Sequence, residues 1–275
     1  MSSKKRMACV LSIILALTIC GAVIYYVLVL KPYNIAVEQY DIAVDNLCSM
    51  NQNLDNAIFD LEQLISNEER IFDDSIREIA IKAIENGRLA KIDIPLKPDK
   101  TEQLLSITEK ISQIDYTDII EKINEAYSKY DMSVKSYKQF VAPTEAFVIE
   151  RLERVEEIIE IAAVTEDNDP NGKLNKAGGY TATVYFESAN VNQKKVYGTD
   201  LIAKGTDAGG AIEVYRSEED AIKRDAYLAV FDGTIIASGS HKVVGTVVIR
   251  TSNELTATQQ SELEAQIIRA FSVVE

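Results

Sequence analysis

The sequence predicts an α+β protein with an N-terminal transmembrane helix, a long antiparallel α-helical hairpin or coiled coil, and a small C-terminal α/β sandwich. Three observations predict this class. Residues 7–30 carry no charged side chain, apolar residues recur every three or four positions between residues 37 and 141, and β-branched stretches alternate with amphipathic ones after residue 180. We expect these segments: a cytoplasmic basic tail at 1–6, the anchor at 7–30, a helical region at 31–164 with a turn near 87–98, a linker at 165–179, and the C-terminal domain at 180–275.

The apolar run at residues 7–30 is long enough to cross a membrane. A helix rises about 1.5 Å per residue, so about 20 apolar residues cross a hydrocarbon core of about 30 Å. Thirteen residues of the run are Val, Leu or Ile, which together favour insertion by about 5 kcal/mol. Lys4, Lys5 and Arg6 precede the run, and such clusters stay on the cytoplasmic side. We therefore expect a single-pass cell-membrane protein with its C-terminus outside.

Two other interpretations of this run are a cleaved signal peptide and a lipoprotein. A cleaved signal peptide has a shorter apolar core followed by small residues, whereas residues 23–30 remain bulky and apolar. Leu17-Thr18-Ile19-Cys20 resembles a bacterial lipobox, but Ile19 stands where that motif has a small residue. A lipoprotein lipidated at Cys20 therefore stays an alternative to the uncleaved anchor.

Composition narrows the possible functions. The net charge of −14 disfavours nucleic-acid binding, because phosphate backbones are repelled by an acidic surface. Only Cys48 lies outside the apolar run, so the exposed part of the chain has no pair of cysteines for a disulfide. A single histidine lowers the expectation of zinc binding or of histidine-based catalysis. We expect no cofactor.

The first long helix is predicted at residues 33–86. Its apolar residues form a seam with a 3.5-residue repeat, in which Asn51 takes one place; such an Asn either fixes the register or faces water. Ser75 and Glu78 form a possible capping box at which the helix restarts, and Gly87 is a plausible helix stop. Pro95 and Pro98 then exclude regular helix. The expected seam residues are Val37, Tyr40, Val44, Leu47, Leu54, Ile58, Leu61 and Ile65.

The second long helix is predicted at residues 99–163. Asp99 with Glu102 would cap it, and Thr144 would cap a continuation beyond a kink at Pro143. Two long helices joined by one short turn predict a hairpin within one chain, and a parallel dimer between chains stays an alternative. The expected seam residues are Leu104, Ile107, Ile111, Ile114, Ile120, Ile123, Tyr127, Tyr130, Val134, Tyr137 and Val141, followed at sevenfold spacing by Val148, Val155 and Ala162.

The helical region resembles membrane-anchored helical proteins of the LemA type. The likeness rests on Tyr33, Asn34 and the tyrosine-rich seam that follows an N-terminal anchor. It implies only an anchor followed by long helices.

The C-terminal region alternates strands with helices. Strands are predicted at residues 181–187, 211–215 and 243–250, and helices at 200–204, at 217–231 and from 256 onward. Ser217 with Asp220, and Thr256 with Gln259, are capping pairs. The inner face of the last helix would consist of Leu263, Ile267, Ile268 and Phe271.

A second resemblance covers residues 166–271. The segments GGYTATVYF, GTDAGGAIEVYRSEEDA, YLAVFDG and SGSHKVVGTVVIRTSNELTATQQ resemble an uncharacterised domain that recurs in membrane-anchored surface proteins of Gram-positive gut bacteria. Some of these relatives are labelled extracellular-matrix-binding, a property that none of these residues indicates. The resemblance implies a location at the cell surface and no particular activity.

Three groups of residues are candidate functional sites, and each also has a purely structural explanation. Asp167, Asp169 and Asn171 match the first half of a calcium-binding loop, but the twelfth position, which needs a bidentate Glu, is Gly178. We therefore prefer an ordinary turn and expect no metal. The glycines of residues 205–210 either bind an anion through their amides or form a flexible loop.

The third candidate is a hydrolase set of Ser240, His241 and Asp232. Adjacent Ser and His seldom achieve the geometry that nucleophilic catalysis requires, so we expect no catalytic residues. The preferred interpretation is a non-catalytic module, presented on helices outside the membrane, that binds an extracellular protein or a cell-wall ligand. An anchored hydrolase that uses the C-terminal domain is the alternative.

Overall fold

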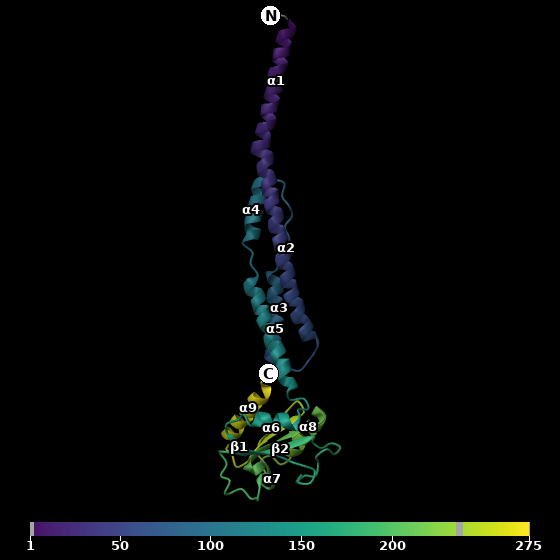
Figure 1. Cartoon of the computed structure of the whole chain (residues 1–275), viewed down its shortest axis with the longest axis vertical. Helices are drawn as coiled ribbons and strands as arrows, with labels where there is room; N and C mark the ends of the chain where they lie inside the picture. The colour runs from purple at the N-terminus through teal and green to yellow at the C-terminus, as the bar shows by residue number, and fades with distance from the viewer. Residues whose placement is uncertain (1–2, 235–238, 275) are drawn as a thin grey trace. The chain divides into compact units, whose positions relative to one another are not determined.

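The computed structural model describes residues 3–234 and 239–274, and it confirms a mixed helical and sheet fold with one five-stranded antiparallel sheet. The chain forms two compact units (Figure 1). The helical unit comprises residues 1–67 and 77–128, and the sheet unit comprises residues 68–76 and 129–275.

The helical unit begins with one long helix. α1 (Ser3–Tyr25) passes through a single π-helical turn, η1 (Tyr26–Leu30), into α2 (Lys31–Ser66) without a break. Within it, the most apolar window has a mean hydropathy of 2.7 and is 0% buried. This helix is long and apolar enough to cross a membrane.

One face of α2 is buried along its whole length, as the apolar repeat predicts. The exposed fraction of Leu47, Leu54 and Leu61 is 0%. At the start of the helix, Ala36 and Ala43 are buried in place of the expected Val37 and Val44, which are half-buried. The inner face is therefore rotated by one residue there, which brings small alanines into the closest contact.

The first predicted helix is divided in two, and it restarts within one residue of the predicted position. α2 ends at Ser66, and α3 (Asp74–Ala90) follows it, so no single helix extends to residue 86. Asp73 rather than Ser75 caps α3, since its carboxylate accepts the Ser75 amide at 2.8 Å. Gly87 does not stop this helix: it is buried inside it, where an added Cβ would lie 2.9–3.0 Å from the Cδ1 atoms of Ile123 and Ile58. The glycine is needed for close helix packing.

The second long helix is also divided. Residues 91–100 have no regular structure, and α4 (Thr101–Ser112) starts at an N-cap, Lys100, that makes no side-chain capping bond, so the predicted Asp99 cap is wrong. α5 (Thr117–Lys138) belongs to the helical unit up to residue 128 and to the sheet unit from residue 129. Asp115 accepts the Thr117 amide at its start.

Beyond α5 the chain departs further from the predicted helix. The Thr144 cap is confirmed: its hydroxyl accepts the Phe147 amide at 3.2 Å and starts α6 (Glu145–Leu152). Helix does not continue to residue 163, because Ile158–Ala163 forms strand β1. Here Ile161 and Ala163 pack against one cluster of buried residues and Ala162 against the other, which is the two-residue period of a strand.

The sheet has the strand order β1-β2-β3-β5-β4, with every neighbouring pair antiparallel. The predicted strand at 243–250 is a hairpin, because Gly245 adopts a φ of +58° and turns the chain. The other strands are β2 (Ala182–Ser188), β3 (Gly209–Val214), β4 (His241–Val244) and β5 (Val247–Thr251).

The helices of this unit start where their capping residues predict. Ser217 accepts the Asp220 amide, and Thr256 forms a complete capping box with Gln259. The helices are α7 (Leu201–Lys204), which leads into the 3₁₀ turn η2 (Gly205–Ala208), α8 (Glu218–Ala229) and α9 (Ala257–Ser272).

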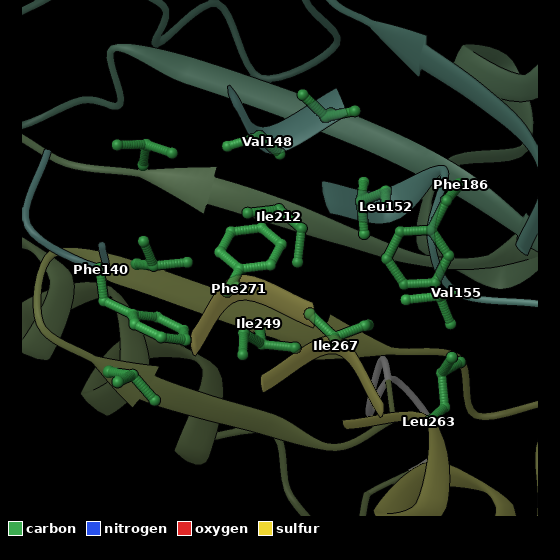
Figure 2. Close-up of a cluster of buried hydrophobic side chains, with 14 of the residues drawn as sticks. Phe140, Val148, Leu152, Val155, Phe186, Ile212, Ile249, Leu263, Ile267 and Phe271 are labelled. Carbon is green, nitrogen blue, oxygen red and sulfur yellow. The ribbon is translucent and has the colours of Figure 1, made fainter. Parts of the chain in front are cut away.

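Two clusters of buried side chains lie on the two faces of the sheet. On one face, Phe271 and Ile267 of α9 lie beside Ile212 and Ile249 of the sheet (Figure 2). Residues before the predicted domain boundary at 180 belong to the same core: Phe140, Val148, Leu152 and Val155. The other face is covered by residues of α7, α8 and the loop at 165–180.

Candidate functional site

The sheet unit contains a cleft of about 490 Å³. It is built from parts of the chain that lie far apart in sequence: the loop at 68–76, the end of α5, α8, the β4–β5 hairpin and α9. Its lining residues are Arg70, Ile71, Phe72, Tyr137, Glu218, Ile222, Lys242, Val243, Val244, Gly245 and Ile268.

Aromatic contacts hold the loop at 68–76 at this position. The ring of Phe72 makes edge-on contacts with Tyr137 and Phe140, at centroid distances of 5.5 and 5.2 Å. Its backbone amide donates to Ser133 Oγ at 3.3 Å. Edge-on aromatic pairs stabilise the fold by about 0.5–1.5 kcal/mol beyond the effect of their burial. These contacts therefore fix the loop to the sheet unit.

The rim of the cleft carries an arginine fixed by two partners. Arg70 Nη1 lies 2.8 Å from Glu218 Oε2, and the Tyr137 hydroxyl donates to Glu218 Oε1 at 3.3 Å. The contact with Tyr137 and the charge of Glu218 both raise the pKa of Arg70, which is charged at neutral pH in any case. Although it is paired with Glu218, Arg70 keeps 65% of its side chain exposed at the rim.

The wall of the cleft is apolar. Ile222 of α8 is 56% exposed, and Val243 and Ile268 lie beside it partly buried. Lys242 also lines the cleft, and its Nζ lies 2.9 Å from Glu264 Oε1. An apolar wall with a few oriented polar groups at its edge is the arrangement of a binding site.

A second polar cluster surrounds a fully buried carboxylate. Glu213 in β3 is 0% exposed and accepts two bonds from Arg224 at 2.8 Å, one from Arg250 at 2.9 Å and one from the Tyr215 hydroxyl at 2.8 Å. Burial by itself would raise the pKa of Glu213, but the bonds and charges of the two arginines hold it below its ordinary value. The same burial, next to the Glu213 charge, raises the pKa of Tyr215. The cluster joins α8 to the sheet and is closed to ligands.

The hydrolase set does not assemble among the described residues. His241 Nδ1 lies 2.6 Å from Asp225 and its Nε2 lies 3.3 Å from Asp232, so both ring nitrogens face carboxylates. The Ser240 hydroxyl instead points at Glu264, at 3.5 Å. The structure therefore brings His241 and Asp232 together and leaves the serine without the base that would activate it.

Asp169, one of the three calcium candidates, is used within its own loop. One carboxylate oxygen of Asp169 accepts the amide of Asn171, and the other accepts the amides of Lys173 and Leu174. Tyr180 also donates to Asp169. Burial by itself would raise the pKa of Asp169, but these hydrogen bonds lower it overall. Across the described residues, no group of three or more His, Cys, Asp or Glu side chains could hold a metal ion.

Two of the glycines at 205–210, Gly209 and Gly210, serve packing. A Cβ on Gly210 would lie 2.2 Å from the Arg250 carbonyl oxygen and 2.4 Å from the Phe186 ring, and one on Gly209 would lie 2.4 Å from the Ser188 amide. Neither side chain could fit, so these glycines let β3 approach its neighbours.

No protein-family model, curated protein or solved structure matches the chain.

Sequence reasoning did not identify the cleft or the buried cluster. No local motif marks Arg70 or Tyr137, because the cleft forms only when distant segments meet. Glu213 gave a usable signal: it sits in AIEVY, a charged residue in an otherwise apolar strand. Such a residue requires a buried partner of opposite charge.

Proposed function

We propose that the protein is a single-pass, membrane-anchored protein that presents a non-catalytic binding module outside the cytoplasm. One observation carries the proposal: residues 7–30 form an exposed, charge-free helix directly behind Lys4, Lys5 and Arg6. Water does not solvate such a surface favourably, whereas a bilayer does. The basic cluster supports a cytoplasmic N-terminus, and in this proposal residues 31–275 lie outside.

In this proposal the helical unit is an antiparallel coiled-coil spacer and the sheet unit is an α/β sandwich that carries the binding cleft. The apolar wall at Ile222 and the charged group of Arg70 suit a segment of an extracellular protein or a cell-wall ligand with an apolar and an acidic part.

The chain contains its own reporter of topology. Cys48 is exposed on α2, while Cys9 and Cys20 lie within the apolar run. A maleimide that cannot cross membranes should label the protein on intact cells, and the Cys48→Ser variant should lose that label. Labelling that appears only after lysis would reverse the orientation.

The lipoprotein alternative gives a different result in the same cells. An uncleaved anchor keeps residues 1–19, so the mass of the purified protein should equal that of the full chain. A mature chain that starts at Cys20 with added acyl mass would replace the anchor with a lipid.

The binding role of the cleft can be tested with a matched pair of surface variants. Ile222 and Val230 are 56% and 71% exposed, and only Ile222 lines the cleft. The full chain in detergent should retain a ligand from cell-wall fragments or surface extracts. Ile222→Asp should abolish that retention, and Val230→Asp should leave it unchanged. Equal retention by both variants would remove the cleft from the proposal.

A further inference from the structure

The cleft of the sheet unit lies against an edge of the sheet. β4 is the last strand in the order β1-β2-β3-β5-β4, so no described strand pairs with its outer side. Four neighbouring residues of the cleft lining, Lys242 to Gly245, belong to β4 and to the turn that follows it. A molecule in the cleft therefore lies beside an edge strand.

The register of the β4–β5 pair shows which backbone groups of β4 face away from β5. The Thr251 amide donates to the Ser240 carbonyl at 2.9 Å, so these two residues form a hydrogen-bonded pair. Bonded and non-bonded pairs alternate along an antiparallel ladder, which makes Val243 and Val248 a non-bonded pair. The amide and carbonyl of Val243 therefore point to the outer side of the sheet, and so do those of His241.

Apolar side chains lie on both faces of the sheet at this edge. Val243 packs against the buried cluster that contains residues of α8, and Val244 belongs to the cluster that contains residues of α9. Ile222 of α8 and Ile268 of α9 also line the cleft. The side chains of a strand laid beside β4 would point alternately towards Ile222 and towards Ile268.

The charged residues of the lining complement an acidic group. Arg70 and Lys242 both line the cleft, and each is more exposed than the glutamate that pairs with it. Of these two glutamates, only Glu218 belongs to the lining. An acidic side chain on the ligand is therefore favoured over a basic one.

The opposite edge of the sheet is protected against pairing. β1 pairs with β2 through a register that shifts between Ile158 and Glu160, and Glu160 is exposed. Bulges and charged side chains are two ways in which proteins block edge strands. β4 keeps a regular register, and Lys242, its charged residue besides His241, has its backbone turned towards β5 and its Nζ held by Glu264.

We propose that the cleft binds an extended polypeptide segment with apolar and acidic residues, which adds to the edge of β4 as a sixth strand. This inference rests on the proposed binding function of the cleft and names the chemical class of its ligand. His241 and Val243 supply the outward amides and carbonyls. They can form up to about four backbone hydrogen bonds with a segment of about three to five residues.

The test selects random linear peptides, displayed on phage, on the full natural chain in detergent. The enriched peptides should carry apolar residues at alternate positions, because alternate side chains of a strand share a face. Peptides whose apolar residues recur every three or four positions would indicate a bound helix and would overturn the proposal.

Val243→Pro is the test variant, because proline lacks the outward amide and is tolerated on an edge strand where that amide makes no ladder bond. Val243→Ala is the matched control, since it shortens the side chain and keeps the amide. An enriched peptide should bind Val243→Pro at least about tenfold more weakly than Val243→Ala. Equal affinities would overturn the pairing with β4. Near-ultraviolet circular dichroism checks that both variants fold.

Methyl groups on the backbone amides of the peptide give a second test, which leaves the protein unchanged. Methylation should weaken binding at least about tenfold at alternate residues, whose amides face β4, and much less at the residues between them. Equal weakening at every position, or none at any position, would contradict a paired strand.

The same measurements separate this inference from the proposed function. Retention of a cell-wall fragment that Ile222→Asp abolishes, with no peptide enriched, would keep the cleft as a binding site and reject a polypeptide as its ligand. Equal retention by Ile222→Asp and Val230→Asp, again with no peptide enriched, would reject both. A dimer of the natural chain that Val243→Pro dissociates would show that a second copy occupies the edge, and would also overturn the proposal.

Discussion

The helical unit and the sheet unit treat buried polar groups differently. In the helical unit the buried polar side chain of α2 is a neutral amide, Asn51, and charged pairs such as Lys91 with Asp55 stay at the surface. In the sheet unit, Glu213 is fully buried between Arg224 and Arg250. A charge can be desolvated only where the protein surrounds it and supplies all its partners.

The difference follows from the shape of the two cores. The buried residues of α2 recur every three or four positions and form one narrow stripe, so every buried position of this helix lies near water. The sheet of the second unit is covered on both faces, and the interior is deep enough to enclose an ion pair. In the narrow core, a hydrogen bond from a neutral side chain holds the neighbouring segment in place. In the thicker core, a buried ion pair can do so.

The largest expected effect comes from placing a charge in the narrow seam. Leu54 of α2 is 0% exposed, so Leu54→Asp loses its burial and leaves a carboxylate without a partner. We expect a loss of at least about 5 kcal/mol and local unfolding of the helical unit. Circular dichroism at 222 nm during urea unfolding of the full chain in detergent measures it. Phe59→Asp, at a 58% exposed position of the same helix, should have little effect; a similar loss there would refute the seam.

The next effect concerns the enclosed ion cluster. Glu213→Ala leaves two arginines without their shared carboxylate and should cost about 3–5 kcal/mol in the sheet unit. Near-ultraviolet circular dichroism of the tyrosines reports it, because Tyr215 contacts Glu213. Tyr215→Phe removes only one bond and should cost about 1 kcal/mol. Equal losses for the two variants would mean that the charge contributes nothing.

The same cluster predicts a pH dependence. The pKa of folded Glu213 lies below its ordinary value of 4.5. The stabilisation is therefore present above pH 4.5 and is lost as the pH falls through the lower, folded-state pKa. The stability difference between the natural chain and Glu213→Gln should shrink below pH 4.5. A difference that grew on acidification would contradict the sign of this shift.

An intermediate effect is expected from removing the Asn51 hydrogen bond of the helical unit. Asn51→Ala removes the hydrogen bond to the Ile92 carbonyl and should cost about 1–2 kcal/mol. Amide hydrogen exchange in residues 91–100 should accelerate, because this segment forms neither helix nor strand and has no regular backbone hydrogen bonds to protect its amides. Asn53→Ala, at an exposed position two residues away, is the control. Unchanged exchange in the Asn51 variant would show that other contacts hold the segment.

The smallest effect is expected at the surface. Lys91 Nζ lies 2.6 Å from Asp55, but their side chains are 37% and 51% exposed. Lys91→Ala should cost less than about 1 kcal/mol, and the difference should vanish in high salt. Thermal melts in low and high salt measure both. A larger, salt-independent loss would indicate that the lysine stem packs against the helices.

Local signals predicted local structure well. The capping residues Thr144, Ser217 and Thr256 each start a helix in the structure, because a cap depends on neighbours three residues away. The buried face of α2 followed from its apolar repeat for the same reason.

Features that depend on distant segments were not predictable. The helix stop at Gly87 failed because Ile58 and Ile123 require a glycine there for packing. Strand β1 was assigned to a helix because sevenfold spacing occurs by chance in a stretch that is apolar on both faces. The cleft was missed because Arg70 and Glu218 meet only in the folded chain.

The loop at 68–76 has a consequence for how the protein is synthesised. Phe72 packs on Phe140, which in turn packs on Phe271, the last aromatic residue of the chain. A ribosome adds about 5–20 residues per second, so Phe72 waits about 10–40 s for this layer to be completed. During that time an early piece of the sheet unit has left the ribosome without its partners. The nascent chain is thus exposed to misfolding and proteolysis until residue 271 has been synthesised, and slower elongation should lengthen that period.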